Sequence, residues 1–211
     1  MKNFYNSKQK NKHKSKKGFT LIELIVVVAI MAMISALSLF DSSRLNSAVL
    51  LSNTAYEISL IIRDAQVSGL GAKVISVQGQ PDTATTSNQG VYFDLDTSES
   101  VVFFADLIKN NRYDAPSGEE SQTYNIENKR AGEIVKICEV SSAGRCANEK
   151  QNLTIMFKRP NPEAYFYTDG DRTGSGYLGS VGINLGFTDG ECRSIIIYKT
   201  GAIQIDKSLC D

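Results

Sequence analysis

A long apolar run near the start of the chain constrains this sequence most, because few structures can accommodate it. Residues 19–40 form a run of 22 residues that contains one charged residue. As an α-helix the run would extend roughly 33 Å, about the thickness of the hydrocarbon core of a bilayer. Residues 1–18 contain seven lysines and no acidic residue, and positive charge of this kind stays on the cytoplasmic side. We therefore expect residues 19–40 to cross a membrane and the rest of the chain to be exported.

The one charge, Glu23, lies close to the start of this apolar run. A secretory signal peptide does not fit, because its apolar core is about 7–15 residues long and is followed by a small-residue cleavage site. A plain signal anchor fits the length and the charges. It gives no reason for a carboxylate that would be costly in lipid without a partner. The position of Glu23 therefore needs a further explanation.

Residues 17–25 read KGFTLIELI, and this stretch resembles the processing motif of type IV pilin and type II secretion pseudopilin precursors. The resemblance implies that a prepilin peptidase cuts between Gly18 and Phe19 and that the new amine on Phe19 is methylated. It also implies that Glu23 pairs with the Phe19 amine of a neighbouring subunit in the filament. Because an unpaired carboxylate in hydrocarbon costs several kcal/mol, this pairing would select the docking register. The alternative is that Glu23 lies at the headgroup level without a role.

The same resemblance implies the partners and the location of the protein. The partners are prepilin peptidase, other pilin or pseudopilin subunits, the inner-membrane platform of an assembly machine, and membrane lipid. The precursor would be a single-pass protein of the cytoplasmic (inner) membrane, and the mature chain would enter an extracellular or periplasmic filament. Many major pilins carry Gly and Pro in this helix, but residues 19–67 contain neither. This departure favours a minor pilin or a pseudopilin.

After the apolar run the sequence becomes amphipathic, and we expect the helix to continue through residues 41–70. Apolar residues recur at the helical steps of four and three. They are Leu51, Ala55, Ile58, Ile62 and Ala65. The expected polar face carries Asn53, Glu57, Arg63, Asp64 and Gln66. Gly69 and Gly71 follow, and glycine is a common helix stop.

The pattern of residues 71–211 predicts an exported, β-rich domain. Short stretches of alternating or continuous apolar residues predict strands. These stretches are residues 91–96, 101–107, 133–140, 153–158, 164–168, 183–187, 194–199 and 202–205. Residues 110–132 are polar, and we expect an exposed insertion there. A helix followed by strands predicts an α+β fold, in which the long N-terminal helix packs on an antiparallel sheet, as the pilin resemblance also implies.

Four cysteines allow three disulfide pairings. We favour Cys138 with Cys146 and Cys192 with Cys210, because each pair closes a local loop on the exported side, where disulfides persist. Free thiols are the alternative. A metal site is disfavoured because residues 19–211 contain no histidine and no CxxC motif, and we expect no metal and no cofactor.

Composition also argues against several functions. The only histidine, His13, lies in the predicted leader, so the mature chain would have no histidine for Ser-His-Asp or Cys-His catalysis. No P-loop motif occurs, and we predict that the protein is not an enzyme. Residues 19–211 carry 16 basic and 23 acidic residues, a formal net charge of −7, which disfavours nucleic acid as a partner. Two oxygen-rich stretches, residues 106–114 and 169–174, are interpreted as ordinary turns rather than calcium loops.

We therefore expect a structural subunit of a type IV pilus or a type II secretion filament. The alternative is a minor pilin at the filament tip that binds DNA for uptake or a surface for adhesion. A DNA-binding subunit would use basic residues on the final hairpin, where this chain has Arg193, Lys199 and Lys207. A single-pass membrane enzyme is a third class, which an intact N-terminus on the membrane-bound protein would support.

Overall fold

The fold was analysed in a computed structural model of residues 1–211. The structure describes residues 18–71, 87–114, 118–126, 132–168, 179–187 and 190–210. The side chains of residues 38–46 are not described. The predicted basic leader, apart from Gly18, lies outside the described residues. The chain forms two units, residues 1–43 and residues 44–211, which are described separately below.

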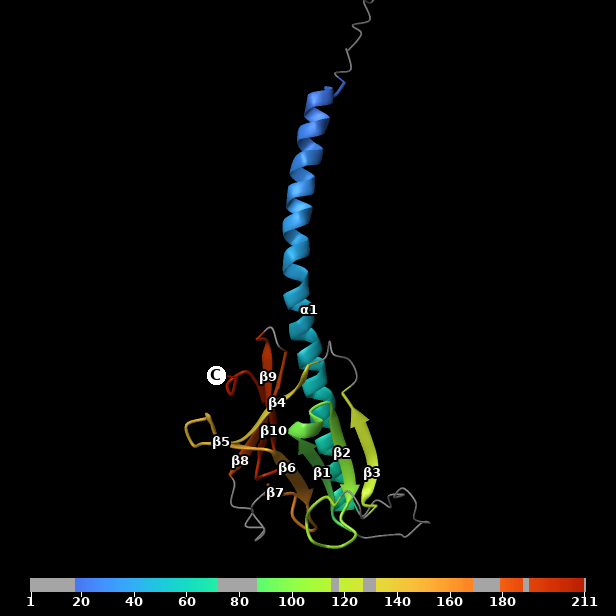
Figure 1. The fold of residues 1–211 in the computed structure, drawn as a ribbon, viewed down its shortest axis with the longest axis vertical. Coiled ribbons are helices and arrows are strands. Elements are labelled where there is room, and N and C mark those ends of the chain that lie inside the picture. Colours follow the sequence, from blue (N-terminus) through green and yellow to red (C-terminus); the bar gives the residue numbers. More distant parts are fainter. Residues whose placement is uncertain are drawn as a thin grey trace, which may run out of the picture. The chain divides into compact units, whose positions relative to one another are not determined.

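The first element is one helix, α1, which runs from Leu21 to Gly71 and shares its residues between the two units (Figure 1). It ends at a glycine, as the sequence predicts. Near this end Gly69 lies against β6, where an added Cβ would lie 2.9 Å from the carbonyl oxygen of Phe157. The helix can therefore approach the sheet closely there because Gly69 has no side chain.

The predicted apolar face of α1 is buried in the second unit. Its residues are at most 1% exposed: Leu51, Ala55, Ile58, Ile62 and Ala65. The assignment of Gln66 to the polar face was wrong. Gln66 is buried, and its side-chain amide donates hydrogen bonds to the carbonyl oxygens of Pro162 and Gly201, at 3.2 and 3.4 Å. The amide therefore satisfies backbone groups from two loops beside the helix.

Two antiparallel five-stranded sheets make up the rest of the second unit, which confirms the predicted α+β class. Sheet A has the order β3-β2-β1-β6-β7, and sheet B has the order β10-β9-β8-β4-β5. The strands of sheet A are β1 Gln89–Asp94, β2 Ser100–Ala105, β3 Glu120–Asn125, β6 Asn152–Phe157 and β7 Ala164–Tyr167. Those of sheet B are β4 Glu133–Val140, β5 Cys146–Lys150, β8 Ser180–Gly186, β9 Cys192–Tyr198 and β10 Ile203–Asp206.

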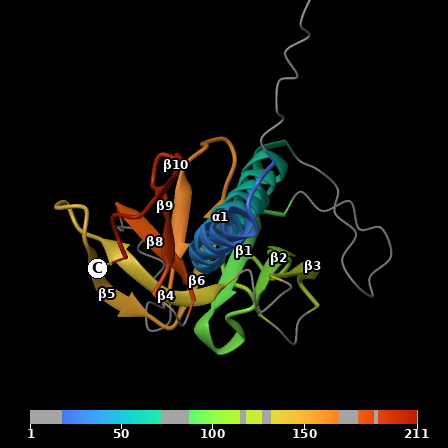
Figure 2. The same ribbon diagram turned by 90° about the horizontal axis from the view of Figure 1, so that it is seen from above.

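The two sheets lie on either side of α1 (Figure 2). Both contribute alternate apolar side chains to one core that they share with α1. In sheet A, for example, Val91 and Phe93 enter this core, whereas Tyr92 between them lies on the opposite face of the sheet. In sheet B the core residues Val181, Ile183 and Leu185 alternate in the same way. This period of two follows from the pleat of a strand.

Two strands were not predicted, and several predicted strands extended one or two residues past the observed end. The polar stretch interpreted as an insertion contains β3, which pairs with β2 at the edge of sheet A. The second is β5, which begins at Cys146 and is an edge strand of sheet B. The strand predicted for residues 91–96 stops earlier, at Asp94, because residues 95–97 form a short 3-10 helix capped by the Asp94 side chain. Edge strands need no apolar alternation, so their sequences carried no strand signal.

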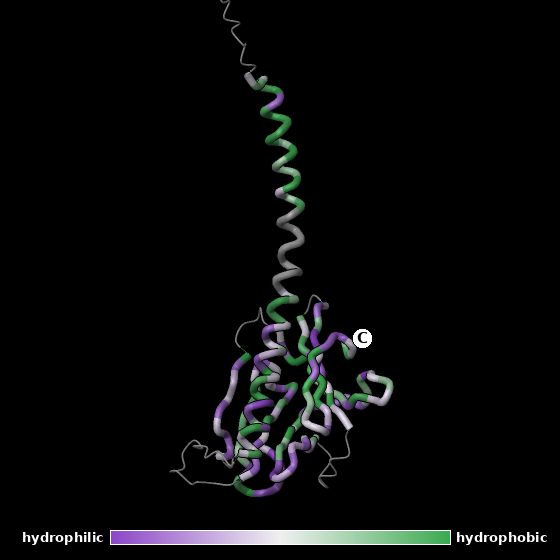
Figure 3. Tube along the Cα trace, turned by 180° about the vertical axis from the view of Figure 1, so that it is seen from behind, coloured by the Kyte–Doolittle hydropathy of each residue, from purple (hydrophilic) through white to green (hydrophobic). Residues whose placement is uncertain are grey.

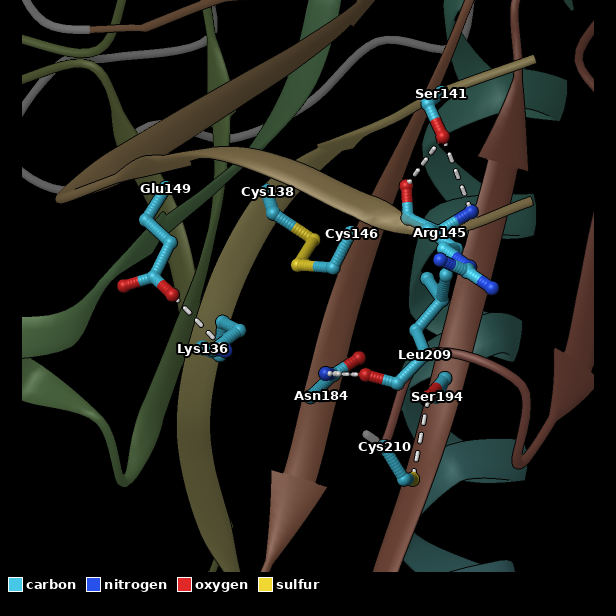
Figure 4. Close-up of a disulfide and its surroundings, with 10 residues drawn as sticks. All are labelled: Lys136, Cys138, Ser141, Arg145, Cys146, Glu149, Asn184, Ser194, Leu209 and Cys210. Carbon is cyan, nitrogen blue, oxygen red and sulfur yellow. Dashed lines mark hydrogen bonds and ion pairs between the residues drawn. A yellow bond between two sulfur atoms is a disulfide. The ribbon is translucent and has the colours of Figure 1, made fainter. Parts of the chain in front are cut away.

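The structure pairs Cys138 with Cys146 (Figure 4) and Cys192 with Cys210, the pairing favoured from the sequence. The first disulfide joins β4 to β5, beside an ion pair between Lys136 and Glu149 at 2.9 Å. The second fastens the C-terminal segment to the start of β9.

The fastened C-terminal segment covers the outer face of sheet B. Leu209 is 1% exposed, and a Cβ added at Gly182 would lie 2.3 Å from its side chain. The carbonyl oxygen of Leu209 accepts a hydrogen bond of 2.6 Å from the side-chain amide of Asn184 (Figure 4). The Cys192–Cys210 disulfide therefore holds a segment that itself shields a sheet.

Removing the Cys192–Cys210 disulfide should destabilise the protein more than removing the Cys138–Cys146 disulfide. The double variant C192A/C210A opens the longer loop and releases Leu209, so we expect a loss of about 3 kcal/mol or more in the free energy of unfolding. The double variant C138A/C146A is the matched control and should lose about 2.5 kcal/mol, as expected for its shorter loop. Urea unfolding of the full chain in detergent measures both, and an equal or larger loss in the control would contradict the assignment.

Candidate functional site

The predicted cleavage site lies in exposed backbone ahead of the helix. Gly18, Phe19 and Thr20 are exposed and precede the first helical residue, Leu21. Phe19 is 85% exposed, and apart from Gly18 and its chain neighbours no described atom lies within 4 Å of a Cβ built on Gly18. A peptidase must bind its substrate as an extended strand, and the Gly18–Phe19 bond is open to such binding.

Thr20 caps the N-terminus of α1, a role that the sequence analysis missed. The side-chain oxygen of Thr20 accepts a hydrogen bond of 3.3 Å from the backbone N–H of Glu23. The carbonyl oxygen of Thr20 accepts the first helical bond, from the N–H of Leu24 at 3.2 Å. The Thr-x-x-Glu spacing is the capping-box pattern, which was readable from the sequence. The cap therefore fixes where the helix begins relative to the predicted cut.

The same cap places Glu23 in the first turn of the helix. In that turn the backbone N–H groups lack helical partners and the helix dipole is positive, so a carboxylate is favoured there. Glu23 is exposed, and among the described residues no hydrogen bond or ion pair reaches its carboxylate. Its charge is therefore available to a group outside the described part of the chain.

Glu23 is surrounded by an apolar helix surface that continues on every side. The large apolar side chains from residue 19 to residue 37 are between 48% and 85% exposed, and Figure 3 shows most of this stretch coloured as hydrophobic. They are Phe19, Leu21, Ile22, Leu24, Ile25, Val26, Val27, Val28, Ile30, Met31, Met33, Ile34 and Leu37. A helix that is apolar all round is stable only when lipid or protein covers it.

Residues 38–40 of the predicted crossing lie outside the residues whose side chains are described. Within the described part of the chain, no helix combines the length and the apolar character that a membrane span requires. The crossing by residues 19–40 stays a prediction.

A family model described as the prokaryotic N-terminal methylation motif matches residues 13–39. The chain carries the leader signature of type IV pilin and pseudopilin precursors. This signature confirms the resemblance predicted from residues 17–25, and it implies processing by prepilin peptidase and assembly with other pilin subunits. Neither a curated protein nor a solved structure matches the chain.

Away from the leader signature, the first oxygen-rich stretch forms a turn. The Asp106 carboxylate is fully buried and accepts hydrogen bonds of 3.0 Å from the backbone N–H groups of Asn110 and Asn111. This is the backbone capping that the sequence predicts for the stretch. The second stretch, residues 169–174, lies outside the described residues. Among the described residues, no cluster of three or more potential metal ligands occurs.

Two basic residues of the final hairpin region have partners within the fold. The Arg193 guanidinium donates a hydrogen bond of 2.9 Å to the Ser52 hydroxyl on α1. The Lys207 ammonium lies 3.7 Å from the Glu191 carboxylate. The Lys207 charge is thus offset by a carboxylate of the protein itself, whereas Arg193 is held by a neutral hydroxyl and keeps its charge.

The part of α1 in the second unit also has an exposed apolar stripe, which the sequence analysis missed. Its members are Val49, Tyr56, Leu60 and Val67, between 57% and 67% exposed. Their steps of seven, four and seven residues match the a and d positions of a heptad. This heptad spacing is present in the sequence, but the apolar pattern of residues 51–65 is more regular and alone was interpreted as a face of the helix.

Replacing Thr20 with alanine should loosen the first turn of α1. Loss of an N-cap costs about 1 kcal/mol, so the amides of Glu23 and Leu24 should exchange with solvent about fivefold faster. Hydrogen exchange followed by NMR in detergent micelles measures this change. Thr20→Ser keeps the capping oxygen and is the control, and equal exchange in the two variants would show that Thr20 is no cap.

Proposed function

We propose that this protein is a structural subunit, a minor pilin or a pseudopilin, of a type IV pilus or a type II secretion filament. In this proposal prepilin peptidase cuts between Gly18 and Phe19 and methylates the amine of Phe19. The mature chain then enters the filament through the apolar part of α1. The protein makes no chemical change in a substrate, and its function is assembly.

The observation that carries the proposal is the isolated carboxylate of Glu23 on a helix surface that is otherwise apolar. In lipid or in a helical bundle this charge would cost several kcal/mol without a partner. Cleavage before Phe19 creates a positive amine at the same end of the helix. The amine of a neighbouring subunit is therefore a partner that the processing step itself supplies.

The pairing also explains how the subunits would find one axial position. Apolar helix surfaces slide past one another with little change in energy, because dispersion contacts are not directional. A carboxylate and an amine in a medium of low dielectric attract strongly, and the attraction is greatest when the two groups touch. The Glu23–Phe19 pair would therefore fix the register of docking, while the apolar residues around it provide the area.

The two disulfides support a location outside the cytoplasm for the second unit. Disulfides persist in oxidising compartments and are rare in the cytosol. Together with the lysine-rich leader, they favour a single crossing of the inner membrane with a cytoplasmic N-terminus. This orientation presents the cleavage site to a peptidase on the cytoplasmic side.

Two further features agree with a subunit that packs through its helix. The stripe of Val49, Tyr56, Leu60 and Val67 provides a second apolar surface at heptad spacing. The backbone of α1 is helical from Leu21 to Gly71, which agrees with the absence of Gly and Pro between residues 19 and 67. This continuity favours a minor pilin or a pseudopilin.

A tip-located subunit for DNA uptake is less favoured, since Arg193 and Lys207 have internal partners.

The processing step predicts the N-terminus of the mature protein. In cells with an active prepilin peptidase, mass analysis should find a chain that begins at methylated Phe19. In cells without the peptidase the lysine-rich leader should remain attached. An intact leader in the presence of the active peptidase would contradict the proposal.

The assembly step predicts that Glu23→Ala separates processing from incorporation. The variant should still be cut at Gly18, because the cleavage site is unchanged. Its fraction in sheared, sedimented filaments should fall at least about tenfold, which corresponds to about 1.4 kcal/mol of lost docking energy. Glu57→Ala removes an exposed carboxylate from the same helix in the second unit and should assemble like the native chain. Equal incorporation of the two variants would show that Glu23 has no role in docking.

A further inference from the structure

The C-terminal segment, residues 207–210, lies on the outer face of sheet B without forming a strand. Strand β10 ends at Asp206, and beyond it the backbone N–H of Cys210 donates a hydrogen bond of 3.2 Å to the carbonyl oxygen of Lys207. This bond closes a turn inside the segment. The segment can therefore leave the sheet without breaking the pairing of β10 with β9.

Leu209 is the apolar contact between the C-terminal segment and the sheet. It is buried, although the two residues before it are exposed. A Cβ built on Gly182 would lie 2.3 Å from the Leu209 side chain and 3.3 Å from that of Val140. A glycine inside a strand often marks a place where another part of the chain approaches closely. The absence of a side chain at Gly182 thus leaves the space that Leu209 fills.

The polar contact beneath the segment is only half satisfied. The side-chain amide of Asn184 is buried and donates its hydrogen bond to the carbonyl oxygen of Leu209 (Figure 4). The Oδ1 atom of the same amide is also buried, and it has no hydrogen-bond partner among the described residues. A buried acceptor without a partner destabilises the closed arrangement, and water would satisfy it once the segment lifts. Closure of the segment therefore depends on a further attachment.

The further attachment is the Cys192–Cys210 disulfide, which is the more accessible of the two disulfides. Cys192 and Cys210 are both half-buried, whereas one member of the other disulfide, Cys138, is 1% exposed. Thiol–disulfide exchange begins when a thiolate reaches one of the two sulfurs. An external thiol should therefore reduce the Cys192–Cys210 disulfide first.

Ser194 favours Cys210 as the sulfur that leaves during this reduction. The Ser194 hydroxyl lies 3.5 Å from Sγ of Cys210, and the hydroxyl is the donor because a disulfide sulfur carries no hydrogen (Figure 4). Ser194 is fully buried, so its hydroxyl is held beside the sulfur. A donor in this place stabilises the negative charge on a departing sulfur, and a stabilised thiolate leaves faster. Attack at Cys192 therefore releases the cysteine that the C-terminal segment carries.

We propose that the Cys192–Cys210 disulfide is a redox-sensitive switch that a protein dithiol of the CxxC class opens. One thiolate of the reductant attacks Sγ of Cys192 and displaces the Cys210 thiolate, which leaves a mixed disulfide on Cys192. The second thiolate of the reductant then attacks the reductant's own sulfur in that mixed disulfide and releases the Cys192 thiolate. The reductant is oxidised to a disulfide, and its two protons pass to Cys192 and Cys210, which are reduced to thiols.

Opening the switch changes the outer surface of sheet B and leaves the fold in place. Leu209 leaves the space above Gly182, so apolar surface is exposed, and the Asn184 amide gains water. Leu209 is not part of the core that α1 shares with the two sheets, and the pairing of β10 with β9 does not involve the segment. This inference concerns the second unit alone and does not depend on the filament proposal.

The test follows both disulfides and the C-terminal segment in the full chain in detergent, with dithiothreitol as the reductant. Differential alkylation and mass spectrometry should show Cys192–Cys210 reduced at least about tenfold faster than Cys138–Cys146. In the selectively reduced chain, amide hydrogen exchange should become at least about tenfold faster at residues 207–210 and stay unchanged at residues 203–206. Oxidised glutathione should then restore the slow exchange of the segment.

A pair of serine variants tests the part played by the buried hydroxyl. Ser194→Ala should slow the reduction of Cys192–Cys210 about threefold and leave that of Cys138–Cys146 unchanged. Ser142→Ala removes a hydroxyl from the exposed turn beside the other disulfide and should behave like the native chain. Equal rates in the two variants would overturn the assignment of Cys210 as the leaving sulfur.

Three results would overturn the switch itself. The two disulfides could be reduced at the same rate, or exchange at residues 207–210 could stay slow after reduction. Exchange could also rise at residues 203–206, which would show that reduction opens the fold rather than the segment alone.

Discussion

The proposed attraction between a carboxylate in the first turn of an apolar helix and an amine on another chain is the interaction on which the filament proposal depends. Thr20 caps the helix and so places Glu23 where the backbone N–H groups and the helix dipole favour a negative charge. The apolar side chains around it remove water from any interface that they form. In that setting a charge pair provides direction, while the surrounding surface provides affinity.

The second unit is organised around the remainder of the same helix. Residues 51–65 of α1 bury one face between two sheets, and Gln66 hydrogen-bonds the loops beside it. The outer faces of the two sheets differ in their covering. The C-terminal segment, fastened by the Cys192–Cys210 disulfide, covers sheet B. On sheet A the loop after β2 instead packs through Tyr113 against part of the outer face. One sheet is thus closed by the chain itself, and the other keeps a small hollow on its outer face.

Residue patterns predicted the features that follow a simple period. The buried face of α1 and most core strands were predicted because burial repeats every three to four residues in a helix and every two in a strand. Strand β3 escaped because its residues, Glu120–Asn125, pair through their backbone at a sheet edge and bury little. Gln66 was misplaced because its partners, Pro162 and Gly201, lie far away in the sequence. The hollow could not be predicted for the same reason, since its lining comes from four separate segments.

The central claim is tested most directly by a zero-length crosslink in intact filaments. This chain is produced with heavy isotopes, assembled among light subunits and treated with a carbodiimide, which joins a carboxylate to an amine only when they touch. The account predicts that mass spectrometry finds the heavy peptide that contains Glu23 joined to the light N-terminal peptide of another subunit. A heavy Glu23 peptide that is joined only to its own Phe19, or to no amine at all, would contradict it.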